Sequence, residues 1–72
     1  MPDMMAPVPK LTPRERQMMG AVARGCSNRE IAGELGLSQQ TVKNQLSVLF
    51  QKLHVRNRLQ LAIYAQRHGL HP

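Results

Sequence analysis

The sequence contains few of the residues that build aromatic cores, disulfides or membrane spans. Its 72 residues include no tryptophan, one tyrosine, one phenylalanine and one cysteine, Cys26. A single cysteine excludes an internal disulfide and is typical of the reducing cytoplasm. No apolar run approaches the roughly 18 residues of a membrane span. Asp3 and nearby prolines stand where a signal peptide needs a basic and then an apolar stretch. We therefore expect a soluble, cytoplasmic domain with an aliphatic core and no membrane partner.

Acidic residues are scarce, and all of them lie in the first half of the chain. The net charge is +6. Residues 1–35 contain five bases and all four acids, whereas residues 36–72 contain five bases and no acid. A basic half on a small globular domain indicates a polyanionic partner. The alternative is that the charge only maintains solubility.

Arrangements that would carry catalysis or bind a metal are also missing. The sequence contains no recognisable nucleophile–base–acid set and no glycine loop that could cradle a phosphate, so we expect neither an enzyme nor a cofactor. Of His54, His68 and His71, only the last two are closely spaced, and we expect no metal site. A basic amphipathic helix could lie on a membrane surface. That interpretation does not explain the successive capping motifs described next.

Residues 1–10 contain three of the five prolines and no helical period, which predicts a flexible tail or linker before a domain over residues 11–72.

Two helix starts with capping-box spacing stand at the beginning of the domain. Thr12 and Glu15 have the spacing of a capping box, with Pro13 at the first helical position. Ser27 and Glu30 repeat the pattern.

Two further helices follow these. Gly36 can end the second helix and Ser38 can cap the third, while Asn57 and Gln60 open the fourth. The expected helices begin at Pro13 and then span residues 28–35, 39–53 and about 58–68. Without a convincing strand, the sequence predicts an all-α, four-helix bundle.

The third helix has two contrasting faces. Its apolar side chains share one side of the helical wheel: Val42, Leu46, Leu49, Phe50 and Leu53. The opposite side carries Gln40, Asn44, Ser47 and Gln51, with Lys43 on one flank and Thr41 and Lys52 on the other. No acid occurs in this helix, so its polar face suits a DNA major groove. The alternative is a solvated surface helix.

The second and third helices have the spacing of a helix-turn-helix. Ala32 is small where the two helices must approach, Gly36 tolerates the positive φ of the turn, and Val42 anchors the second helix of the pair. This spacing is moderately specific, because some helical pairs that bind no DNA share it.

Several blocks of the sequence together resemble the DNA-binding domain of the LuxR/FixJ family. The blocks are LTPRER, GCSNREIAGELGLSQQTVKNQLSVLFQKL and VRNR, within residues 11–68. The resemblance implies a helix-turn-helix bundle in which the third helix reads the major groove and the fourth can dimerise. It also assigns Lys43, Asn44 and Ser47 to the groove, and Thr41, Asn28 and Arg29 to phosphates. The chain departs from the usual pattern at Ala21, Gln45, Val48 and Leu61. Val48 could touch a thymine methyl group or be a tolerated exposed apolar residue.

The fourth helix has more apolar surface than one core needs. Leu61, Ala62 and Ala65 form one stripe, whereas Leu59 and Ile63 form a second. The second stripe predicts a weak homodimer. The alternative is that Leu59 or Ile63 packs inside the monomer.

These observations predict a transcription regulator, or its C-terminal effector domain, that binds double-stranded DNA. The expected DNA-binding residues are Asn28, Arg29, Gln40, Thr41, Lys43, Asn44, Ser47 and Lys52. An N-terminal receiver or ligand-binding domain outside this chain would suit the proline-rich start. The alternative function is an interaction module that pairs with a larger regulator through helix 58–68. Such a module would not need the basic, acid-free surface of the third helix.

Overall fold

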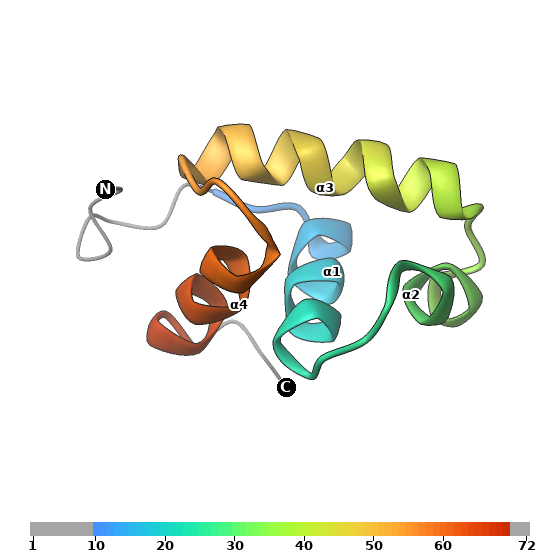
Figure 1. Ribbon diagram of the computed structural model, residues 1–72, viewed down its shortest axis with the longest axis horizontal. Helices are drawn as coiled ribbons and strands as arrows, with labels where there is room; N and C mark the ends of the chain where they lie inside the picture. Colours follow the sequence, from blue (N-terminus) through green and yellow to red (C-terminus); the bar gives the residue numbers. More distant parts are fainter. Residues whose placement is uncertain (1–9, 70–72) are drawn as a thin grey trace.

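The computed structural model describes residues 10–69, which form four helices and no strand. The helices are α1 (Pro13–Ala23), α2 (Asn28–Leu35), α3 (Gln39–Leu53) and α4 (Arg58–Arg67). Figure 1 shows α3 lying across one side of the other three, with α2 and α4 on either side of α1. This arrangement confirms the predicted all-α class. Almost all of the expected proline-rich tail lies outside the described residues, as does His71.

Reciprocal capping boxes start the first two helices, as predicted. Glu15 N donates to Thr12 Oγ1 at 3.1 Å, and Thr12 N donates to Glu15 Oε1 at 2.8 Å. Ser27 and Glu30 repeat this exchange at 3.1 and 2.8 Å. Each box satisfies two N–H groups that a helix start leaves without an intrahelical partner, which explains why α1 and α2 begin at these residues.

Glu15 also connects α1 to α3. Its Oε1 lies 3.0 Å from Lys52 Nζ, and only 17% of its side chain is exposed. The hydrogen bond from the Thr12 amide lowers the pKa of Glu15; desolvation opposes this effect, and Lys52 adds to it. Because the folded pKa lies below the unfolded one, Glu15 stabilises the fold above its unfolded pKa. That contribution disappears as the pH falls through the folded pKa.

We expect Glu15→Gln to flatten the acid limb of the stability profile. Urea unfolding between about pH 5 and pH 3 should show a smaller loss of unfolding free energy than in wild type, because the variant carries no charge to lose. Glu34→Gln removes a charge from an exposed pair with Arg24 and serves as the control. Equal acid limbs in wild type and Glu15→Gln would contradict this role for Glu15.

A glycine in the left-handed region forms the turn between α2 and α3. Gly36 has φ 68° and ψ 36°, and its N–H donates to the Ala32 carbonyl. Leu37 N donates to the same carbonyl at 2.9 Å. Ser38 Oγ then accepts from Thr41 N at 3.0 Å and starts α3. The predicted helix-turn-helix spacing is therefore present, with α2 packed against α3.

The ends of α4 differ in detail from the prediction. Asn57 Oδ1 accepts from Gln60 N at 2.9 Å, so the predicted cap is present. Gln60 does not return a bond to Asn57, because its Oε1 accepts from Arg56 N at 2.7 Å. The helix ends at Arg67, one residue earlier than expected, with His68 as its C-cap.

One aliphatic core joins the four helices. Its fully buried large side chains are Met18, Met19, Ile31, Val42, Leu49 and Leu61. Phe50 was expected in this core but is only partly buried at its edge, and so are Ala23, Leu35 and Ala62. Cys26 packs against the core as a small apolar group, as expected. None of the helices within residues 10–69 is long and apolar enough to span a membrane.

The second apolar stripe of α4 stays outside this core. Helix α4 packs against α1 through the side that carries Leu61, Tyr64 and Ala65. Leu59 is 69% exposed and Ile63 is 39% exposed. The sequence alone left open whether these two side chains pack inside the monomer, and neither belongs to the buried core.

Candidate nucleic-acid interface

The outward face of α3 is polar and accessible. Gln40, Asn44, Ser47 and Gln51 are exposed, as the helical wheel predicts, whereas Val42, Leu46, Leu49 and Leu53 are buried. The apolar side fixes the helix on the core, and the short turn after α2 fixes its start. Side chains on such a rigid element can present donors and acceptors in a defined order.

Hydrogen bonds along this face orient the predicted groove residues. Gln40 Nε2 donates to Asn44 Oδ1 at 3.0 Å, which leaves the Asn44 amino group as an outward donor. Ser47 Oγ donates to the Lys43 carbonyl at 3.1 Å, which leaves the hydroxyl lone pairs as acceptors. Lys43 itself is exposed. The structure thus brings Gln40, Lys43, Asn44 and Ser47 together on adjacent turns.

Thr41 stands at the first turn of α3 with a hydroxyl group suited to an anion. Ser38 Oγ donates to Thr41 Oγ1 at 2.9 Å. Because that bond uses a lone pair of Thr41, the Thr41 hydroxyl hydrogen can point to a different acceptor. A phosphate oxygen near the N-terminus of a helix is such an acceptor.

The two candidate residues at the start of α2 differ in how accessible they are to a ligand. Arg29 is exposed. Asn28 is half-buried, and its Oδ1 accepts from Arg58 Nη1 at 2.7 Å. Arg58 also donates to the Cys26 carbonyl and therefore joins the start of α4 to the start of α2. The sequence analysis did not predict this contact, which joins residues 30 positions apart. The amino group of Asn28 keeps its donors for a ligand.

Lys52 lies apart from the groove residues. Its ammonium group is part-buried in the ion pair with Glu15, where α3 passes α1. Its expected contact with a phosphate stays a prediction, and in the free protein this lysine holds two helices together.

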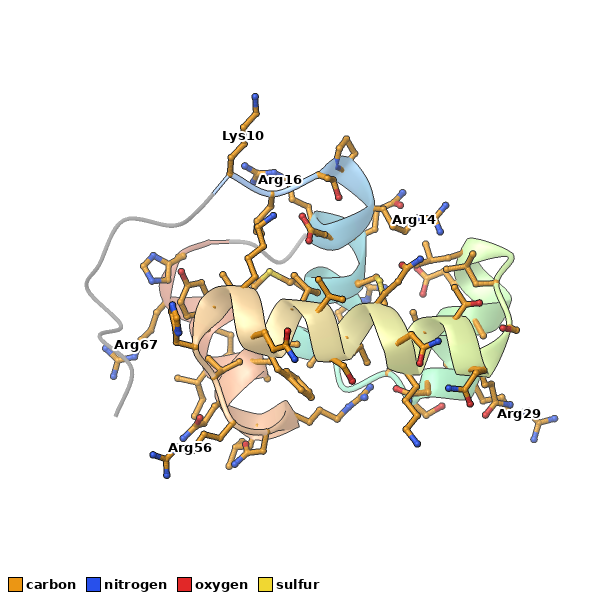
Figure 2. The ribbon with its side chains drawn as sticks, turned by 90° about the horizontal axis from the view of Figure 1, so that it is seen from above. Lys10, Arg14, Arg16, Arg29, Arg56 and Arg67 are labelled. Atoms are coloured by element: carbon orange, nitrogen blue, oxygen red, sulfur yellow. The ribbon has the colours of Figure 1, made fainter. Side chains whose placement is uncertain are left out.

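Arg14 is a candidate site residue that sequence reasoning missed. It lines a shallow depression between α1 and α3 together with Thr12, Glu15, Gln45 and Val48. Figure 2 shows Arg14 with Lys10 and Arg16 on one side of α3, and Arg29 and Arg56 on the other side. No local signal in the sequence points to Arg14, because only the packing of α1 beneath α3 places it there.

A four-helix core, a glycine turn between α2 and α3 and an exposed, acid-free α3 define a helix-turn-helix domain. The bacterial regulatory proteins of the luxR family match this chain over residues 9–65. The chain belongs to that family, which confirms the resemblance seen in the sequence. The family consists of DNA-binding regulators and is not a class of enzymes.

Curated relatives show the same relationship. The transcriptional regulatory protein LnrK of Bacillus subtilis is 43% identical over 60 residues, which cover 83% of this chain and 27% of LnrK. DesR of the same organism, also a transcriptional regulatory protein, is 35% identical over 69 residues, covering 96% of this chain and 35% of DesR. The response regulator protein VraR of Staphylococcus aureus is 42% identical over 60 residues, 83% of this chain and 29% of VraR. The chain thus spans about a third or less of each relative, and these relationships support DNA-binding transcription regulation.

Proposed function

We propose that α3 enters the major groove of double-stranded DNA and that the chain is the sequence-specific, DNA-binding part of a transcription regulator. The observation that carries this proposal is the rigid, acid-free outer face of α3. Lys43, Asn44 and Ser47 would contact base edges, with Gln40 beside them. Asn28, Arg29, Thr41 and Lys52 would hold the helix against phosphates.

Cations on both sides of α3 support this orientation. A major groove about 12 Å wide admits one α-helix and is bordered by a phosphate strand on each side. Arg29 and Arg56 flank one side of α3, and Arg14 flanks the other. We include Arg14 among the proposed phosphate contacts. Phosphate contacts would then fix the register of α3, and the side chains on its outer face would select the sequence.

We expect affinity for a selected operator to fall steeply with salt. Each neutralised phosphate releases counterions, so raising the salt from about 50 to 200 mM should weaken binding about tenfold or more. Fluorescence anisotropy with a labelled duplex measures this slope. Arg14→Ala should weaken binding to all sequences and make the slope shallower, whereas Gln17→Ala, on the exposed surface of α1, should change neither. A flat salt response would contradict the proposed mode.

We also propose that two copies pair weakly through α4. The exposure of Leu59 and Ile63 supports this, because a two-fold axis would bury each patch against its own copy. Two α3 helices would then face two half-sites, so the operator would be an inverted repeat. One small patch offers little area, and we expect pairing to depend on DNA.

The same exposed stripe favours one other function. An interaction module could use Leu59 and Ile63 of α4 to pair with a larger regulator and modulate it. One selection experiment separates the two functions. Selection from a random DNA pool should yield a consensus sequence for a DNA-binding regulator and none for a module that acts only by pairing.

The length of the relatives supports a longer regulator. Because this chain matches only about a third of LnrK, DesR or VraR, we propose that it works beside an N-terminal receiver or ligand-binding domain in the cytoplasm. Mass measurement of the protein from its native source would test this.

A further inference from the structure

We infer that Val48 contacts the C5-methyl group of a thymine in each operator half-site. The inference rests on the proposed function and adds a base preference to it. Val48 is 57% exposed although it is apolar. It lies one turn after Asn44 and about 40° from it around the helix axis, so it belongs to the outward face of α3.

The chemistry of the major groove leaves one partner for such a side chain. Base edges there present hydrogen-bond donors and acceptors, and only thymine adds a methyl group. A valine facing guanine or adenine would desolvate their polar atoms without pairing them. The same side chain against a thymine methyl buries apolar surface on both partners.

The surroundings of Val48 agree with this assignment. The depression that it lines also contains the side chain of Arg14. A guanidinium group there could hold a phosphate while Val48 touches the base. The Glu15 carboxylate in the same depression is already bonded to Thr12 N and Lys52 Nζ. Gln45 also lines the depression and is half-buried there.

The test replaces single thymines in the selected operator with deoxyuridine, which removes only the methyl group. Deoxyuridine at one position of each half-site should weaken operator binding by the wild-type protein about fourfold. This factor corresponds to about 0.8 kcal/mol for one buried methylene-sized group. The Val48→Ala variant should bind operators with thymine or deoxyuridine at that position with equal affinity. Gln17→Ala changes an exposed side chain of α1, outside both the proposed DNA and dimer surfaces, and should retain the fourfold ratio.

Cytosine methylation provides a second measurement at the same position. With wild type, 5-methylcytosine should bind about fourfold better than cytosine, because it presents the methyl group again; with Val48→Ala this difference should disappear. The inference is overturned if wild type binds a specific operator but no thymine methyl matters, or if Val48→Ala keeps the methyl dependence. Those results leave DNA binding itself intact. Failure to select any operator would overturn both proposals.

Discussion

Ile63→Glu is expected to abolish cooperative binding to paired half-sites while leaving the affinity for a single half-site unchanged. Ile63 and Leu59 form the exposed stripe of α4, and a buried glutamate at its centre would be desolvated without a partner. Linked binding events commonly gain on the order of a hundredfold in affinity. That gain should be lost, as measured by electrophoretic mobility shifts on duplexes with one or two half-sites.

A variant of the opposite charge separates an interface effect from repulsion by DNA. Ile63→Lys should also lose cooperativity, although its charge favours DNA. Circular dichroism must show native helix content for both variants, because Ile63 lies outside the core and its replacement should not unfold the protein. If either variant unfolds, or still binds paired sites cooperatively, this dimer surface is misassigned.

Asn44→Ala is expected to change the sequence preference at one or two base pairs. Loss of a bidentate amide contact costs about 1–3 kcal/mol, or about fivefold to 150-fold in affinity, and only for the preferred base. Lys43→Ala should have a similar effect at a neighbouring position. Selection from a random pool, followed by competition binding, measures both changes.

A phosphate-contact variant is the control for these two. Thr41→Ser keeps the hydroxyl group and should retain the wild-type preference, whereas Thr41→Val should weaken all sequences alike. Lys52→Ala should also weaken all sequences alike, and it should lower stability because it removes the partner of Glu15. Unchanged affinity and unchanged preference in Lys43→Ala would remove that residue from the recognition set.

Local chemistry explains why the sequence predicted the helices so closely. Thr12 and Glu15 are three residues apart and satisfy each other's amides without help from the rest of the fold. The same holds for Ser27 and Glu30, and Gly36 supplies its own left-handed turn. The two faces of α3 follow from its apolar period, so the polar set around Asn44 was also predictable.

Contacts between side chains of different helices could not be predicted from the local sequence. Arg58 bonds to Asn28 across 30 positions of sequence, and Lys52 meets Glu15 across 37. Gln60 bonds to Arg56 N in place of Asn57, which depends on how the chain enters α4. Long side chains can reach many partners, and only the packed arrangement selects one.

The four helices, the glycine turn and the acid-free face of α3 were predictable from the sequence, because each depends on residues within a few positions of one another. The packing of the helices settles which stripe of α4 is buried, where Arg14 lies and which lysine pairs with Glu15. These outcomes depend on the angles at which the helices pack. Those angles are set by the summed burial of side chains from all four helices, which no single stretch of sequence contains.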